Sequence, residues 1–362
     1  MKGKCDRMQM DTTLPANGQS AATPLLLPVT PAAYSASHLT DASPRDTVAA
    51  NDDTAPRTAV QQHYVVVVNN SAGSSSKFSD EALKAASPDA TFEILSVSPD
   101  ALNSAFDKAF NAKPTAVIVV GGDGTARAAA VRAVQTGIPI SPMPGGTMNV
   151  LPKIIFGHGD MARAIADLPR LQPSALDVGR VSGEMFFLSA AFGLAGPMAR
   201  LREATRSEHK FDRIRKAAGA LLKSIRPSLQ CRVRWRTPND KWRNAHSLIV
   251  AIGDIERILS PDGEDHGSRL EVAALKLRSV WQMFAFGAAF VSGAWRNSKN
   301  LKIVRAREVE IIVPSKRPLI VLDGEPMRVS RVGMVTLERG ALPVLAMPLD
   351  QHAAVNEPSV AR

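Results

Sequence analysis

Residues 116–125 have the sequence Ala-Val-Ile-Val-Val-Gly-Gly-Asp-Gly-Thr, in which a β-branched run leads directly into a glycine-rich loop. The run at 116–120 is typical of a buried strand, and residues 125–135 are typical of a helix. Three glycines let backbone N–H groups approach an anion closely, and the start of the helix adds a favourable dipole. No Lys-Ser/Thr pair follows, so this is not a Walker A loop. The alternative is a tight strand-to-helix turn with Asp123 as a local cap.

Strands and helices alternate on both sides of this segment. Residues 64–68, Tyr-Val-Val-Val-Val, predict a strand buried on both faces, and 91–97 and 138–141 predict two more. Helices are expected from Ser79 and at 101–110. This alternation predicts a parallel sheet with right-handed crossovers, whose ligands gather beyond the carboxyl ends of the strands.

Two further polar loops follow predicted strands of this sheet. Residues 69–73, Asn-Asn-Ser-Ala-Gly, come after the first strand, and 142–149, Pro-Met-Pro-Gly-Gly-Thr-Met-Asn, come after the last. Asp123 could bind Mg²⁺ or orient a hydroxyl, and Thr125 could cap its helix or touch a phosphate. Each loop alone could be an ordinary turn. Three of them on one rim of a sheet indicate a nucleotide site.

After about Gln172 the pattern changes to the alternation of antiparallel strands. In residues 229–236, Leu-Gln-Cys-Arg-Val-Arg-Trp-Arg, odd positions are apolar and even positions polar or basic, as in a half-buried strand. Other strands are expected at 185–190, 247–252, 309–313, 318–322 and 334–338. Helical interruptions are expected around 198–225 and 279–295.

The predicted domain organisation has four parts. Residues 1–62 are rich in Ala, Thr, Ser, Asp and Pro and predict a disordered tail. An α/β nucleotide domain at 63–172 and a β-rich domain at 173–349 follow, and 350–362 form a second tail.

Composition narrows the function further. The chain of 362 residues has a net charge of +10, and because the N-terminal tail is nearly neutral, the excess belongs to the folded body. It predicts an anionic partner, such as a nucleotide, nucleic acid or acidic membrane surface. Aromatic residues are only 5% of the chain, which disfavours stacking on single-stranded nucleic acid.

The two cysteines and one short apolar stretch indicate the cellular compartment and the kind of membrane contact. Cys5 and Cys231 cannot build a disulfide framework, which favours the cytoplasm. Residues 280–295 fall short of the ~20 that a membrane-spanning helix needs. Any membrane contact is therefore expected to be peripheral.

Three motifs in fixed order now suggest a family: Gly-Gly-Asp-Gly-Thr at 121–125, Pro-Gly-Gly-Thr-Met-Asn at 144–149 and Leu-Asp-Gly-Glu at 322–325. From about Tyr64 to Pro348 the chain resembles the diacylglycerol kinase catalytic-domain family, which includes bacterial lipid kinases and the sphingosine and ceramide kinases. The resemblance implies a phosphofructokinase-like parallel-sheet nucleotide domain followed by an antiparallel β-sandwich domain, with ATP and Mg²⁺ as cofactors.

The resemblance also implies roles for individual residues. Glu325 matches the proton acceptor, for which a β-turn between Leu322 and Met327 is the alternative. Asp123 lies in the match to the phosphate loop and is a candidate catalytic residue and metal ligand, because with the glycine loops it would hold ATP and Mg²⁺. The positions that match the ATP-binding loops are Asn69, Ser71, Ala72, Gly73, Gly122, Asp123, Gly124, Thr125 and Thr147.

The chain departs from the family pattern at several positions. Arg127 and Ala128 stand where the family usually has Asn-Glu, and Asn70 stands where it usually has Pro. Arg127 is either a cation near the phosphates or a solvated helix residue. Asp265-His266-Gly267 is the nearest match to an Asp-Asp-Gly run that feeds a structural Mg²⁺ site. Asp265 is therefore a candidate ligand, with His266 at a usually acidic position.

Two stretches could meet a membrane. The first stretch is basic and could dock on anionic headgroups or form a solvated helix face. Its cations are Arg200, Arg202, Arg206, Lys210, Arg213, Arg215, Lys216, Lys223 and Arg226. The second stretch is aromatic and could meet lipid or pack into the core. Its rings are Trp281, Phe284, Phe286, Phe290 and Trp295.

The leading hypothesis is a cytoplasmic, peripherally membrane-associated lipid kinase. It would transfer the γ-phosphate of ATP to a hydroxyl of a diacylglycerol-like or sphingoid lipid at an anionic membrane surface, with no nucleic acid as partner. NAD kinases share a Gly-Gly-Asp-Gly loop and provide one alternative. A catalytically silent lipid- or nucleotide-binding regulatory protein provides another.

Overall fold

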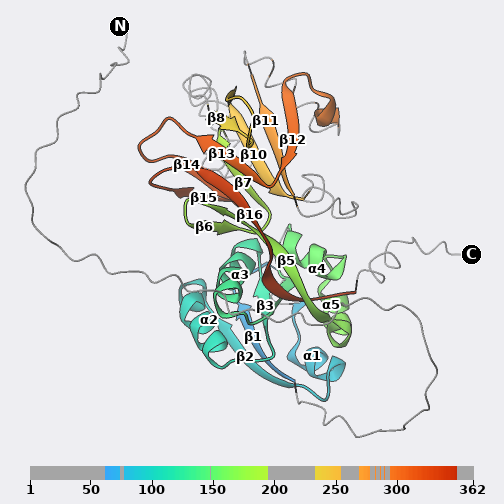
Figure 1. The fold of residues 1–362 in the computed structure, drawn as a ribbon. Coiled ribbons are helices and arrows are strands. Elements are labelled where there is room, and N and C mark those ends of the chain that lie inside the picture. Colours follow the sequence, from blue (N-terminus) through green and yellow to red (C-terminus); the bar gives the residue numbers. More distant parts are fainter. Residues whose placement is uncertain are drawn as a thin grey trace, which may run out of the picture. The chain divides into compact units, whose positions relative to one another are not determined.

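A parallel sheet of four strands lies between helices in the first part of the fold (Figure 1). Its strands are β1 (His63–Asn69), β2 (Thr91–Val97), β3 (Ala116–Gly121) and β4 (Ile140–Pro144), in the order β2-β1-β3-β4. The structure is a computed structural model. It describes residues 62–73, 77–146, 148–194, 233–253, 269–277, 282, 286, 289 and 294–348. All of these belong to one compact unit, Ala59–Arg362.

The helices of this part pack in pairs. Helix α2 packs against α3, and α1 packs against α5. The bounds are α1 (Asp80–Ala86), α2 (Leu102–Asn111), α3 (Asp123–Thr136), α4 (Val150–Phe156) and α5 (Met161–Asp167), with 3-10 turns at Pro99–Ala101 and Leu168–Arg170. The helix expected from Ser79 is present as α1, and Ser79 caps it, because its hydroxyl accepts the N–H of Ala82. Val65, Val66 and Val67 are fully buried, which confirms the two-sided burial predicted for β1.

The strand order creates a switch point at the centre of the sheet. From β1 the chain moves outward to β2 and then crosses back to β3 on the other side of β1. Ligands of open α/β sheets bind where the strand order reverses in this way. The loops that follow β1 and β3 flank that position.

The second part is a β-sandwich, so the predicted fold class is confirmed. One layer is a six-stranded antiparallel sheet of order β12-β11-β10-β7-β14-β15. The other layer belongs to a ten-stranded sheet that continues from β4 through β16, β13, β8 and β9, with β5 and β6 attached beside β16. The strands are β5 (Gln172–Val181), β6 (Glu184–Phe186), β7 (Ser189–Gly193), β8 (Val233–Arg236), β9 (Arg243–Ala245), β10 (Ser247–Ile252), β11 (Leu270–Leu275), β12 (Leu301–Ala306), β13 (Glu308–Ile312), β14 (Leu319–Leu322), β15 (Glu325–Arg328) and β16 (Met334–Ala346).

The sandwich core lies between the two layers. Trp235 and Phe186 come from the ten-stranded sheet, and Phe192, Leu248 and Leu270 come from the six-stranded sheet. In β8 the predicted alternation is confirmed, since Val233 and Trp235 are buried and Arg234 is exposed. Burying these large side chains supplies the main stabilisation of this part.

The sequence placed two strands of the sandwich incorrectly. The strand expected at 185–190 is divided into β6 and β7 by a break at Phe187 and Leu188. The strand expected at 334–338 continues to Ala346 as β16, past a β-bulge at which Gly340 adopts a φ of +56°. Glycine tolerates this conformation, and a bulge interrupts the alternation from which strands are predicted.

The aromatic stretch contributes to the core where it is described. Trp295, in the 3-10 turn Ala294–Asn297, is buried with Ala251 and Ala273, and Phe286 packs against this cluster. Trp281, Phe284 and Phe290 lie outside the described residues, as does the basic stretch between Arg200 and Arg226. No helix in the described part is both long and apolar enough to cross a bilayer.

Candidate functional site

Three loops are numbered by their order in the chain: the first is 69–73, the second 121–125 and the third 142–149. A side-chain hydrogen bond ties the first loop to the second. Asn69, at the end of β1, donates through Nδ2 to Oγ1 of Thr125 at 3.0 Å, and its own Oδ1 accepts the N–H of Ser71 at 3.1 Å. Thr125 lies in the first turn of α3 and is buried. One asparagine therefore fixes both the shape of its own loop and its distance from the next.

The second and third loops touch through their backbones. The N–H of Gly145 donates to the carbonyl of Gly121 at 3.1 Å. A Cβ atom on Gly146 would lie 2.7 Å from Cα of Gly122, closer than real Cβ contacts come. Glycine is therefore required here by the close approach of two loops. All three loops meet at one edge of the sheet, as the sequence predicted.

Asp123 lies at the start of α3 and reaches α4. Its Oδ1 accepts the N–H of Val150, the first residue of α4, at 3.0 Å. An acidic residue at a helix N-terminus is favoured by the helix dipole. Within the described residues its second oxygen has no hydrogen-bond partner, so that oxygen can serve a ligand.

Glu325 lies opposite the second loop. The hairpin β14–β15 turns through Asp323 and Gly324, whose φ angles of +51° and +90° are those of a two-residue type I′ turn. A Cβ atom on Gly124 would lie 3.6 Å from Oε1 of Glu325. The turn considered as an alternative role for this motif is therefore present, and it also brings the exposed Glu325 carboxylate to the glycine loop.

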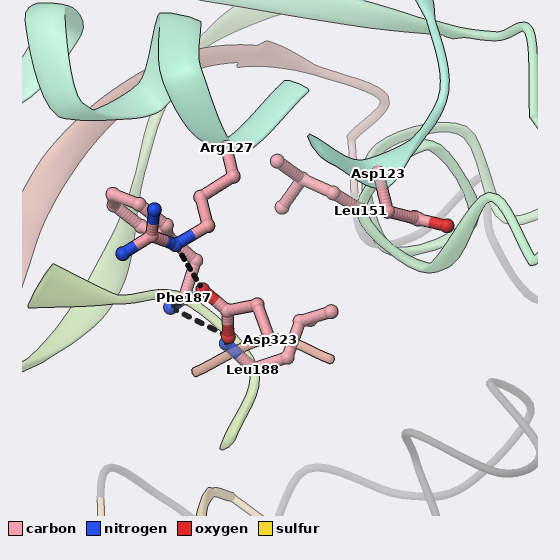
Figure 2. Close-up of a pocket in the computed structure, with 6 residues that line it drawn as sticks. All are labelled: Asp123, Arg127, Leu151, Phe187, Leu188 and Asp323. Atoms are coloured by element: carbon pink, nitrogen blue, oxygen red, sulfur yellow. Dashed lines mark hydrogen bonds and ion pairs between the residues drawn. The ribbon is translucent and has the colours of Figure 1, made fainter. Parts of the chain in front are cut away.

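An ion pair joins helix α3 to this hairpin, as Figure 2 shows. Nε of Arg127 lies 3.4 Å from Oδ2 of Asp323, and Nη2 of Arg127 donates to the carbonyl of Met185 at 3.0 Å. Oδ1 of Asp323 also accepts the N–H of Leu188 at 2.8 Å. The carboxylate therefore binds Arg127 and the break between β6 and β7 at the same time.

Burial sets the electrostatics of Asp323. Its side chain is only 4% exposed. Burial raises the pKa of the carboxyl above its ordinary value, while the N–H groups of residues 187–189 and the charge of Arg127 lower the pKa. A buried carboxylate costs free energy unless it is paired and hydrogen-bonded, and here it is both.

These motifs and their geometry agree with a known sequence family. The segment 63–181 matches the model of the diacylglycerol kinase catalytic domain. Residues 63–181 belong to the diacylglycerol kinase catalytic-domain family.

Solved structures support the same fold beyond this catalytic domain. A diacylglycerol kinase of Bacillus anthracis str. Sterne aligns with a TM-score of 0.54 at 15% identity, over 80% of this chain and 97% of that one. Two further structures from that organism, which carry the provisional name diacylglycerol kinase, have TM-scores of 0.58 at 18% and 20% identity. Each covers 80% of this chain and 98% of its own. At these identities the likeness shows the shared fold alone.

The structure brings most of the predicted site residues together. Those that meet at the edge of the sheet are Asn69, Ser71, Ala72, Gly73, Gly122, Asp123, Gly124 and Thr125, with Glu325 from the sandwich. Thr147, Asp265 and His266 lie outside the described residues.

Sequence reasoning missed the pair formed by Arg127 and Asp323. The side chain of Arg127 is 18% exposed, so it is not a solvated helix residue, and its guanidinium faces Asp323. Asp323 belongs to the Leu-Asp-Gly-Glu motif, from which only Glu325 was given a role. Two features of the sequence could have indicated this pair: an arginine at a position where the family usually has Asn, and an aspartate in the Leu-Asp-Gly-Glu motif with the opposite charge.

The described residues fit ATP with Mg²⁺. Glycine backbone around Gly73, Gly122 and Gly124 is open, since a Cβ atom there would meet at most one neighbour, no closer than 3.6 Å. In the described part, no three His, Cys, Asp or Glu side chains cluster as a metal site. Mg²⁺ at nucleotide sites commonly uses one or two carboxylates together with substrate phosphates, and Asp123 can supply one.

Proposed function

We propose that the protein is an ATP-dependent lipid kinase that phosphorylates a hydroxyl of a diacylglycerol-like or sphingoid lipid. The observation that carries this proposal is the meeting of three glycine-bearing loops at the switch point, with the Glu325 carboxylate opposite Gly124. The family of residues 63–181 and the fold of the Bacillus anthracis proteins support it.

The glycine loops bind the phosphates of ATP. The N–H groups of residues 122–124 lie at the N-terminus of α3, a helix of 14 residues, where the dipole favours anions. The hydrogen bond between Asn69 and Thr125 keeps the first loop within reach of the same phosphates. Bound Mg²⁺ offsets phosphate charge, and the second oxygen of Asp123 would help to hold it.

Glu325 accepts the proton of the acceptor. The lipid hydroxyl oxygen forms a bond to the γ-phosphorus of ATP while the bond from that phosphorus to the β–γ bridging oxygen breaks. The hydroxyl proton passes to the carboxylate of Glu325, and ADP leaves. The proximity of Glu325 to Gly124 supports this role.

Arg127 and Asp323 position this base. The ion pair joins α3, which begins at Asp123, to the hairpin that carries Glu325. A shift of about 1 Å in a reacting group can cost about 100-fold in rate, so a buried link between the two elements matters for catalysis.

A small cavity of about 10 Å³, enough for one water molecule, lies between these elements. Leu151, Phe187 and Leu188 line it together with Asp123, Arg127 and Asp323 (Figure 2). The choice of a lipid acceptor in this proposal is supported by the family of residues 63–181.

The test is transfer of labelled phosphate to a panel of acceptors. Purified protein is incubated with γ-labelled ATP and Mg²⁺ in neutral detergent micelles that contain a diacylglycerol, a sphingoid base or NAD. We expect label in a lipid product and its loss in Asp123→Asn and Glu325→Gln. Label in NADP would support the NAD kinase alternative, and ATP binding without transfer would support a regulatory protein.

A further inference from the structure

Positive charge is concentrated in one part of the chain. Residues 63–172 carry nine Lys and Arg against nine Asp and Glu, whereas residues 173–349 carry 29 against 17. Residues 173–349 therefore hold the whole excess. Such an asymmetry indicates that a surface of this part meets an anionic partner.

Four of these cations gather at the open end of the hairpin β14–β15. Lys316 and Arg317 precede β14, Arg328 ends β15, and Arg331 follows it. Nη1 of Arg328 donates to the carbonyl of Arg317 at 3.3 Å, and the N–H of Val329 donates to the carbonyl of Pro318 at 3.2 Å, so the two loops lie side by side. All four side chains are exposed, and in the described part of the chain no carboxylate pairs with them.

Two exposed apolar side chains lie within four residues of these cations along the chain. Ile312, at the end of β13, is 39% exposed, and Met334, at the start of β16, is 46% exposed. The N–H of Ile311 donates to the carbonyl of Gly333 at 2.9 Å, which joins the two strand ends. Among the described residues, only one other large apolar side chain, Met148, is exposed to this degree.

We propose that this interfacial patch, defined as Ile312, Lys316, Arg317, Arg328, Arg331 and Met334, docks the protein on an anionic bilayer. The cations match lipid phosphates, and the two apolar side chains enter the boundary between headgroups and acyl chains. A nucleic acid would satisfy the cations but leave Ile312 and Met334 in water. The patch also lacks the aromatic rings on which unpaired bases stack.

One hairpin connects the patch to the candidate base. Arg328 is three residues from Glu325 along β15, or about 10 Å at ~3.3 Å per residue. Docking through the patch brings Glu325 within that distance of the headgroup layer, where the hydroxyl of a membrane lipid lies. This step rests on the proposed function, whereas the docking itself does not.

Vesicle binding tests the docking without any enzyme assay. The full chain is co-sedimented with phosphatidylcholine vesicles that contain either no anionic lipid or phosphatidylglycerol at about one lipid in three. Each cation near an anionic bilayer strengthens binding by about fivefold. We expect binding to the anionic vesicles only, and a loss of about 100-fold or more in Lys316→Ser/Arg317→Ser/Arg328→Ser/Arg331→Ser.

A matched variant separates this patch from charge in general. Lys276, Lys299, Lys302 and Arg307 are exposed cations at β11 and β12, on the opposite edge of the six-stranded sheet from β15. Changing these four to serine removes the same charge, and we expect less than a tenfold loss. An equal loss in both variants, or binding of wild type to duplex RNA but not to vesicles, overturns the proposal.

The apolar members of the patch are tested by salt. In Ile312→Ser/Met334→Ser we expect binding at low salt, where the cations act, and loss at about 0.5 M salt, where they are screened. Wild-type binding that vanishes equally at high salt overturns the apolar contribution.

Phosphate transfer in neutral detergent micelles keeps the two proposals distinct. The four-cation patch variant is expected to retain transfer there, because micelles present the acceptor without an anionic surface. If wild type transfers no phosphate in micelles but binds anionic vesicles through the patch, the proposed function fails and the docking stands. If transfer is normal and both variants bind vesicles like wild type, the docking fails and the function stands.

Discussion

Replacing Arg127 with alanine is expected to lower the free energy of unfolding by about 3 kcal/mol at neutral pH. Asp323 would keep its three backbone N–H donors but lose the one cation that pairs with it among the described residues. Removing one partner of a buried ion pair costs about 3–5 kcal/mol. The remaining donors and the 3.4 Å separation of Nε and Oδ2 place the value at the low end.

The raised pKa of Asp323 gives this loss a pH dependence of known sign. Because burial raises the pKa of the folded carboxyl, the folded protein holds this proton at higher pH than the unfolded chain. Stability from this group therefore falls as pH rises from the unfolded pKa through the folded pKa. Arg127 lowers the folded pKa, so its removal raises it further. The loss of unfolding free energy in Arg127→Ala should therefore shrink in acid, where Asp323 is protonated in wild type and variant alike. It should grow as pH rises.

Urea unfolding followed by circular dichroism between pH 4 and 8 measures this deficit. The matched control is Arg132→Ala on the same helix, whose partner Asp107 is 64% exposed, and a loss of about 1 kcal/mol or less is expected there. In the transfer assay, Arg127→Ala should lower kcat by about 10–100-fold with KM for ATP changed less than about twofold. Arg127→Lys should restore part of kcat. A deficit that is absent, or that is the same at every pH, would refute the reasoning.

Three further variants test the loops, and Gly73→Ala serves as a control. Asp123→Asn keeps an acceptor for the N–H of Val150 at the start of α4, so its melting temperature should stay within a few degrees of wild type. Phosphate transfer should fall about 100-fold or more. Normal turnover would remove Asp123 from the mechanism. Gly146→Ala forces a Cβ atom against Gly122. It should weaken ATP binding at least tenfold and lower the free energy of unfolding by about 2 kcal/mol. In the control Gly73→Ala the new Cβ atom meets no atom within 4 Å, so this variant should unfold like wild type. Equal unfolding midpoints for the two glycine variants would contradict the packing. Asn69→Ala removes the hydrogen bond between the loops and should cost about 1 kcal/mol and raise KM for ATP; an unchanged KM would show that the first loop needs no such tie.

The α/β part could be predicted from the sequence because its signals are local. The run at β1, the glycines after β3 and the start of α1 at Ser79 each depend on residues adjacent in the chain. The common rim of the three loops followed from one general rule about parallel sheets. Their actual contacts, such as Gly146 against Gly122, confirmed the rule at atomic distances.

The sandwich was harder because its determinants are distant in sequence. The break between β6 and β7 is stabilised by Asp323, 134–136 residues further on. β16 crosses a bulge at Gly340 and joins both halves of the fold by pairing Val344 with Ile140. Neither the bulge nor the pairing has a periodic signature, so the sequence predicted two separate sheets where one is continuous.

The role of the Leu-Asp-Gly-Glu motif was partly predictable. Asp-Gly is a recognised signal for a tight hairpin turn, and the structure has that turn. That Glu325 would lie beside Gly124, and that Asp323 would pair with Arg127, depends on how the sandwich packs on the α/β part. No local pattern contains that information.

The most direct test of the account compares ATP binding with phosphate transfer in Glu325→Gln. Calorimetry with ATP and Mg²⁺ should give one site per chain in both proteins with affinities within about threefold, because the loops and not Glu325 bind the phosphates. Transfer of labelled phosphate to lipid should fall about 100-fold or more in the variant. No heat of ATP binding to wild type, or equal transfer by both proteins, would contradict the account.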